Sequence, residues 1–185
     1  MARLFSIRPA ITFKGREFKG LRGFAGKPLH PPLTDIPVAA YVIFPAFDLI
    51  SYFYDRGEEI SRNFFTAGTY VLVAGFIVSL GAALTGFWDW LKSTPKRTQA
   101  RRTANFHMTV MLTVTALVII NWALRQGETY TTAGILVLSI VIGLLVTLGA
   151  TYGGSLVYDY GFNVETSGDH PAWHESEEDV YPGQH

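Results

Sequence analysis

Two histidines are the residues of this chain best suited to hold a cofactor. His30 belongs to the run His-Pro-Pro-Leu-Thr-Asp-Ile-Pro, which precedes the first apolar stretch, and His107 lies in the first turns of the third. A pair of imidazoles can ligate a haem iron from both sides, and imidazole with carboxylate suits zinc or non-haem iron. Either chemistry requires the fold to bring the two rings together.

Composition limits what else the chain can do. Its 185 residues include no cysteine, so disulfides, thiolate zinc sites and iron–sulfur ligation by this chain are excluded. There is no Ser-His-Asp order and no phosphate-binding glycine loop. We therefore expect no catalytic activity of its own, and membrane lipids rather than nucleic acid as partners.

Four apolar stretches predict an all-α integral membrane protein. Hydrophobic residues make up 49% of the chain and form long blocks with few charges. The predicted spans are 36–54, 63–91, 103–124 and 132–152, close to the ~20 residues that cross a bilayer. Asp48 lies within the first span and must face other helices, the outer interface or water, because a carboxylate exposed to lipid is costly.

Lysine and arginine residues predict the orientation. Twelve of the fifteen lie in the N-terminal arm, 1–29, or in the loop between the second and third spans. Such loops are cytoplasmic, so both termini are predicted to be cytoplasmic. Short loops make neighbouring helices antiparallel, which predicts a four-helix bundle over 30–162. The arm is expected to be basic and extended, and the tail, 163–185, acidic and flexible.

The start of the first helix is predicted from its prolines. The segment 26–37 contains four, and each disfavours the α conformation in the residue before it. We therefore expect an extended lead-in that contains His30, followed by a helix capped by Thr34 or Asp35.

This topology gathers polar residues from distant parts of the chain at one face of the membrane. They are His30, Asp35, Asp89, His107, Tyr158 and Asp159, with Asp48 as a further polar candidate. Ionisable groups at such depth are costly unless they are paired. A shared ligand or a closed hydrogen-bond network is expected.

The first interpretation of this cluster is a b-type haem. His30 and His107 would be its axial ligands, and Trp88 and Phe106 would pack on the porphyrin. With His107 about one turn into its helix and His30 outside any helix, such a haem would lie near the membrane surface.

Two other interpretations remain open. In one, His30 and His107 bind a divalent metal together with Asp35 or Asp89. In the other, nothing is bound: Asp35 caps a helix, and Asp89 accepts a hydrogen bond from a histidine ring.

Several spaced motifs also resemble a known family. They are the run 30–37, Asp48, Leu-Thr-Gly-Phe-Trp-Asp-Trp at 84–90, His107, and Gly-Gly-Ser-Leu-Val-Tyr ending at Tyr158. Together they resemble the bacterial membrane domain called domain of unknown function 2231, over about 27–164. Many of its members have a second histidine where this chain has Asp35.

The resemblance implies a four-span protein of a bacterial inner membrane. Some members are fused to Rieske-type iron–sulfur domains, which implies service near an electron-transfer chain. The leading hypothesis is an accessory or anchor subunit of a membrane electron-transfer complex, with haem b or a metal at the cytoplasmic helix ends. Its partners would be separate membrane or peripheral redox subunits.

The alternative is a non-redox structural subunit with a cofactor-free polar cluster. Small residues recur at four-residue spacing in the second and fourth spans, for example Gly75 with Ser79 and Ser139 with Gly143. Such faces allow close helix packing. In this hypothesis they dock onto larger partners.

Overall fold

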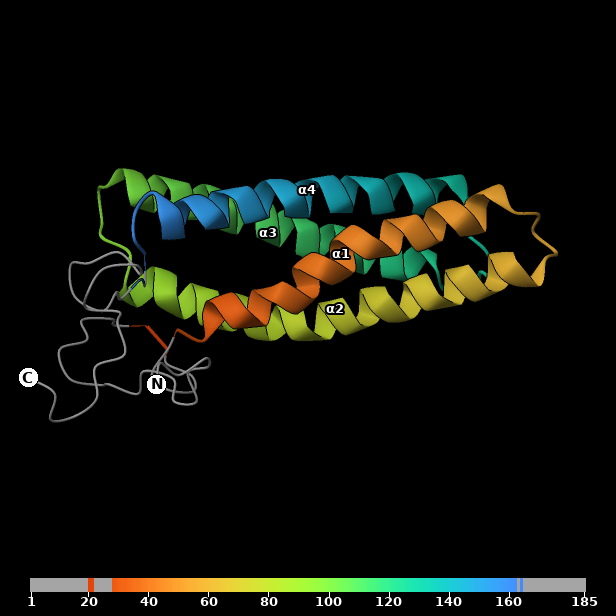
Figure 1. Ribbon diagram of the computed structural model, residues 1–185, viewed down its shortest axis with the longest axis horizontal. Helices are drawn as coiled ribbons and strands as arrows, with labels where there is room; N and C mark the ends of the chain where they lie inside the picture. The colour runs from red at the N-terminus through yellow and green to blue at the C-terminus, as the bar shows by residue number, and fades with distance from the viewer. Residues whose placement is uncertain (1–19, 22–27, 163, 165–185) are drawn as a thin grey trace, which may run out of the picture.

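The computed structural model describes residues 20–21, 28–162 and 164, and in this part the chain forms four long α-helices and no β-strand (Figure 1). They are α1 (His30–Phe53), α2 (Glu59–Lys92), α3 (Gln99–Leu124) and α4 (Ala133–Tyr158). Each is long and apolar enough to cross a membrane, which confirms the predicted all-α class. The acidic tail and most of the basic arm lie outside the described residues.

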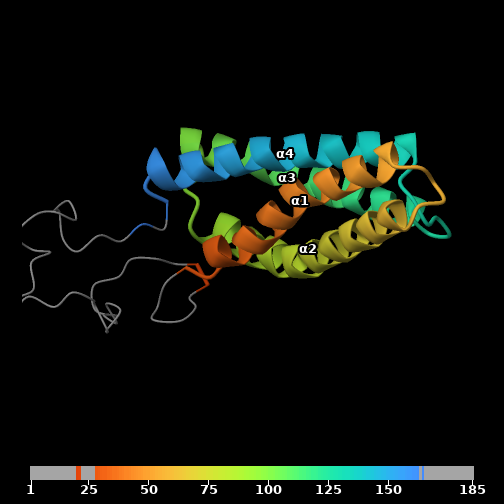
Figure 2. The same ribbon diagram turned by 45° about the vertical axis from the view of Figure 1, so that its right-hand side comes forward.

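The helices form two antiparallel hairpins. α1 packs most extensively on α2, and α3 on α4, whereas α2 and α3 contact each other least of the neighbouring pairs. α1 begins beside α2 and crosses toward α4 at its other end (Figure 2). We call the end where α1 and α3 begin the histidine end, and the opposite end, which contains Asp48 and Arg125, the ion-pair end.

The first helix begins earlier than predicted. Residues 30–32 form its first turn, with Leu29 at the N-cap position, so the expected extended lead-in is wrong. The first N–H groups of a helix have no acceptor within it, and prolines therefore lose no bond there. Thr34 and Asp35 lie inside α1 instead of capping it, and the Asp35 side chain is exposed.

The other helices also extend beyond their apolar stretches. α2 begins at Glu59, α3 at Gln99, and α4 continues to Tyr158. Thr98 caps α3: its hydroxyl accepts a hydrogen bond from the Arg101 amide, 3.1 Å away. The early start of α3 places His107 eight residues from its beginning, about 12 Å along the helix at 1.5 Å per residue.

Large apolar side chains from all four helices fill the middle of the bundle. The fully buried ones are Tyr41, Phe44, Leu72, Val114, Val118, Ile142 and Val146. This core connects the hairpins between the two polar ends.

Small residues let the helices approach closely around this core. A Cβ on Gly75 would lie 2.7 Å from the Ala40 Cβ, and one on Gly143 would lie 3.3 Å from the Tyr41 carbonyl oxygen. Pro45 cannot bond that carbonyl, and α4 approaches it there. Gly75 and Gly143 therefore serve helix packing inside the bundle, and the docking of small-residue faces onto larger partners stays a prediction.

Candidate functional site

His30 packs against α2 at the start of α1. Its Nδ1 lies 2.9 Å from the Ala82 carbonyl oxygen and 3.4 Å from the Thr85 hydroxyl. A carbonyl oxygen can only accept, so Nδ1 carries a proton and donates it. The ring lies directly on the α2 backbone, because a Cβ on Gly86 would be 2.6 Å from its Cε1 atom. Only glycine leaves room for the ring here.

His107 has the same arrangement on α4. Its Nδ1 lies 2.8 Å from the Gly149 carbonyl oxygen, which again requires Nδ1 to donate. A Cβ on Gly153 would lie 3.2 Å from the Cε1 atom of the ring. In both hairpins the glycine beside the ring comes four residues after the carbonyl that accepts the bond.

The two imidazoles are equivalent in chemistry as well as in packing. With Nδ1–H held by a carbonyl, a neutral ring presents its lone pair at Nε2, the usual arrangement of a metal-binding histidine. No hydrogen bond from a described residue reaches either Nε2 atom.

Both histidines belong more fully to helices than the sequence predicts. Ala82 precedes the end of α2 by ten residues, about 15 Å, and His107 follows the start of α3 by about 12 Å. His30 belongs to a helix, and His107 is more than two turns inside one. The position of a bound ligand near the membrane surface stays a prediction.

The packing of Trp88 and Phe106 on a porphyrin stays a prediction, and in this structure both rings contact other residues. Trp88 is 42% exposed, and its ring lies 5.3 Å from the Lys92 ammonium group. Phe106 is 44% exposed and packs on Tyr152, with ring centroids 4.3 Å apart. Trp88 is two residues from Gly86, and Phe106 is next to His107 in the sequence. Their rings nevertheless contact Lys92 and Tyr152.

Three of the predicted polar residues lie outside the histidine cluster. The side chains of Asp35 and Asp159 are exposed, and Tyr158 is 88% exposed. In the described part of the chain, no group of three or more His, Asp or Glu side chains could hold a metal ion. A metal site completed by Asp35 or Asp89 therefore finds no support in the geometry.

Asp89 is buried at the histidine end but has a different role from the predicted one. Its carboxylate accepts a hydrogen bond from the Leu21 backbone amide, 3.2 Å away. The histidine rings bond to helix carbonyls instead of to Asp89. Leu21 in turn accepts from the Leu29 amide at 3.0 Å, so Asp89 anchors the chain just before α1.

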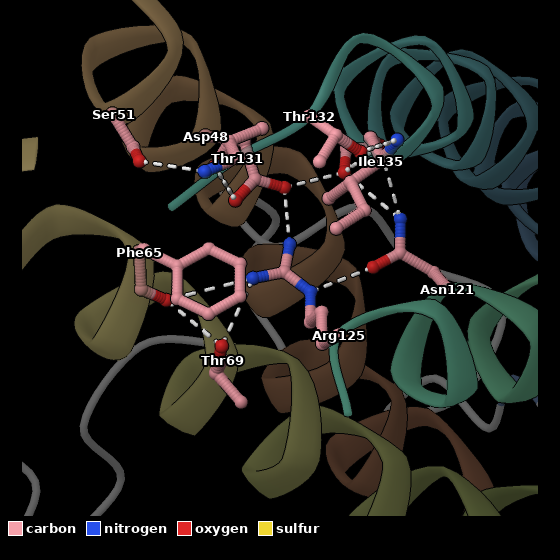
Figure 3. Close-up of polar contacts among 10 residues, drawn as sticks. Asp48, Ser51, Phe65, Thr69, Asn121, Arg125, Thr131, Thr132 and Ile135 are labelled. Carbon is pink, nitrogen blue, oxygen red and sulfur yellow. Dashed lines mark hydrogen bonds and ion pairs between the residues drawn. The ribbon is translucent and has the colours of Figure 1, made fainter. Parts of the chain in front are cut away.

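Asp48 belongs to a second polar site, at the opposite end of α1 (Figure 3). It is 0% exposed and forms an ion pair with Arg125, which follows the last residue of α3. Its carboxylate also accepts hydrogen bonds from the hydroxyls of Thr131, at 3.2 Å, and Ser139. Of the three environments predicted for Asp48, contact with other helices is the one observed.

Arg125 links this site to the remaining helices. Its Nε donates to the Asn121 side-chain oxygen at 2.7 Å. Its Nη1 donates to the Thr69 hydroxyl at 3.0 Å and to the Phe65 carbonyl at 3.5 Å. The ring of Phe65 also lies 5.1 Å from the guanidinium carbon. Every nitrogen of the guanidinium group has a partner, as a buried charge requires.

The comparison with known families supports the membrane assignment. Residues 26–166 match the model of a family described as predicted membrane protein, DUF2231. The chain belongs to this family. No curated protein and no solved structure matches the sequence of this chain.

Arg125 is the buried charged residue of this DUF2231 protein that the sequence did not reveal. In the sequence it is only the one basic residue of the connection between the third and fourth spans. Two spacings could have identified it. It follows Asn121 by four residues, which places both on one helix face, and it follows His107 by eighteen, as Asp48 follows His30.

Proposed function

We propose that this DUF2231 protein is an accessory or anchoring subunit of a membrane electron-transfer complex in a bacterial inner membrane, and that it binds a b-type haem through His30 and His107. The observation that carries the proposal is the matched pair of imidazoles. Each has Nδ1–H bonded to a carbonyl and Nε2 without a described partner. Bis-histidine ligation needs two such nitrogens.

The hydrogen bonds of the two rings also support this function. A haem supplies one-electron chemistry, and the protein around it adjusts the reduction potential through axial ligands, their hydrogen bonds and burial. His30 and His107 would provide the two imidazole ligands. The carbonyls of Ala82 and Gly149 accept a hydrogen bond from Nδ1–H of each ring, which raises the basicity of its Nε2. The chain's own contribution is to orient these rings within the membrane.

The test is the absorption spectrum, with metal analysis, of the full chain purified from a membrane. We expect a Soret band, with low-spin spectra typical of two imidazole ligands, and iron in proportion. His30→Ala and His107→Ala should each abolish that spectrum. His174→Ala is the matched control, because it removes a histidine from the acidic tail and should leave the band unchanged.

A folded, purified protein with neither chromophore nor metal would contradict the haem proposal. The imidazoles would then serve only to tie α1 to α2 and α3 to α4. Zinc or non-haem iron without a Soret band would instead favour the metal interpretation.

A further inference from the structure

The hydrogen bonds at the ion-pair end connect the two hairpins. Arg125, from the α3–α4 hairpin, bonds to Asp48 in α1 and to Thr69 in α2. The hydroxyls of Thr131 and Ser139, also from the α3–α4 hairpin, donate to the Asp48 carboxylate. The Thr131 amide also donates to the Ser51 hydroxyl at 3.0 Å. These bonds fix one end of each hairpin against the other.

The bonds of the histidines, by contrast, stay within one hairpin each. His30 bonds to α2, and His107 bonds to α4. Across residues 28–162, no hydrogen bond joins one histidine to the helices of the other hairpin. Beyond them, two hydrogen bonds join α2 to α3 beside the short loop between these helices: the Trp90 indole donates to Asn105 at 2.7 Å, and Arg101 donates to the Trp90 carbonyl at 2.6 Å. These bonds involve neither histidine and neither α1 nor α4. The spacing between the imidazoles therefore also depends on contacts farther from this end.

Helical periodicity relates the two polar ends. Asp48 follows His30 by eighteen residues, and Arg125 follows His107 by eighteen. Eighteen residues make five turns at about 3.6 residues per turn and extend about 27 Å. Asp48 and Arg125 therefore project from the same sides of their helices as the two histidines. Pairing them constrains the rotation of α1 and α3 about their axes.

We propose that Asp48 and Arg125 form the joint that fixes the two hairpins relative to each other, and that they are thereby positioning residues for His30 and His107. In lipid no hydrophobic effect draws helices together, so specific polar bonds select one packing. The histidines lie about 27 Å along their helices from this joint. A tilt of about 5° at the joint would therefore displace them by about 2 Å. A buried ion pair is well suited to this role, because it specifies geometry more than it adds net stability.

The experiment measures the spacing of the hairpins at the histidine end. The chain has no cysteine, so Ile36→Cys in α1 and Tyr158→Cys in α4, both exposed positions, provide the only two sites for spin labels. Distances between the labels are measured by pulsed electron paramagnetic resonance in lipid nanodiscs. The background variants are Asp48→Asn, Arg125→Gln and the double variant.

We expect a narrow distance distribution in the parent protein and a broader one, shifted to longer distance, in each single variant. The double variant separates positioning from charge burial. It leaves no unpaired charge, so its melting temperature should recover relative to the single variants. Its distance distribution should stay broad, because the ion pair between the hairpins is still missing.

Ser61→Ala is the matched control. It removes a buried hydrogen bond at the same end, from the Ser61 hydroxyl to the Ser51 carbonyl at 2.7 Å, but this bond lies within the first hairpin. Its distribution should match that of the parent. A narrow distance distribution in the double variant, like that of the parent, would overturn the proposal. If the single variants do not fold, the double variant alone provides the test. The readout needs no haem, so its outcome is independent of the proposed function.

Discussion

The two polar ends of the bundle differ in how completely their groups are bonded. At the ion-pair end, both Asp48 carboxylate oxygens and all three Arg125 guanidinium nitrogens have partners within the described chain. At the histidine end, each imidazole uses Nδ1 and leaves Nε2 without a described partner. A closed network has no capacity left for a ligand, whereas a half-bonded imidazole inside a membrane does. Burial of a charged residue therefore does not by itself mark a binding site here.

The largest effect should follow from breaking the ion pair. Arg125→Ala leaves the Asp48 carboxylate buried without its cation, and we expect a loss of about 3–5 kcal/mol in the free energy of unfolding. Thermal unfolding in detergent, followed by circular dichroism, measures it. Ser139→Ala removes only one hydroxyl donor to the same carboxylate and should cost about 1–2 kcal/mol. Equal losses in the two variants would mean that the charge has no special role.

An intermediate effect is expected where glycine accommodates a histidine ring. Gly86→Ala would place a Cβ 2.6 Å from His30, so the ring or the helix must move, at a cost of about 1–3 kcal/mol. Gly153→Ala is less crowded, at 3.2 Å from His107, and should cost less. Unfolding measurements and, with haem bound, the position of the Soret band test this order.

Gly81→Ala is the control for these glycine variants. It lies in α2 with no atom within 4 Å of the added Cβ, so the helix should gain up to about 1 kcal/mol from the higher propensity of alanine. A loss in Gly81→Ala as large as in Gly86→Ala would show that helix backbone effects, and not the histidine contact, explain the results.

Hydropathy and local motifs were sufficient to predict the spans and the family. The four apolar blocks became four helices, because a chain in lipid must satisfy its own backbone hydrogen bonds. The start of α1 was predicted wrongly, because the rule for residues before proline was applied to a segment that forms a first helical turn. The same prolines are compatible with an extended segment or with a first helical turn, and the packing of His30 on Gly86 favours the helix.

The polar partners depend on tertiary contacts that sequence spacing does not reveal. Asp48 and Arg125 are 77 residues apart in sequence, and they meet only because α1 crosses from α2 toward α4. Likewise, backbone carbonyls bond to the histidine rings, and a carbonyl has no sequence signature. A carboxylate partner, Asp89, was the natural prediction for those rings. It bonds to the chain before α1 instead.

A smaller effect is expected from removing a histidine in protein prepared without haem. His107→Gln loses one hydrogen bond to a helix carbonyl, which contributes about 1 kcal/mol. The same holds for His30→Gln and the Ala82 carbonyl. If the comparison of the two ends is right, both variants should unfold within a few degrees of the parent, measured by the same melting assay. Losses as large as that of Arg125→Ala would indicate that the histidines hold the bundle together.

The last prediction changes no stability and concerns which side of the membrane each end faces. Gly57→Cys lies in the exposed loop at the ion-pair end, and Lys96→Cys lies in the exposed basic loop at the histidine end. The positive-inside rule places the basic loop in the cytoplasm. A membrane-impermeant maleimide should therefore label Gly57→Cys in intact spheroplasts, and Lys96→Cys only after permeabilisation. The reverse pattern would place the histidines toward the outer face, where a partner would have to exchange electrons from the opposite side of the membrane.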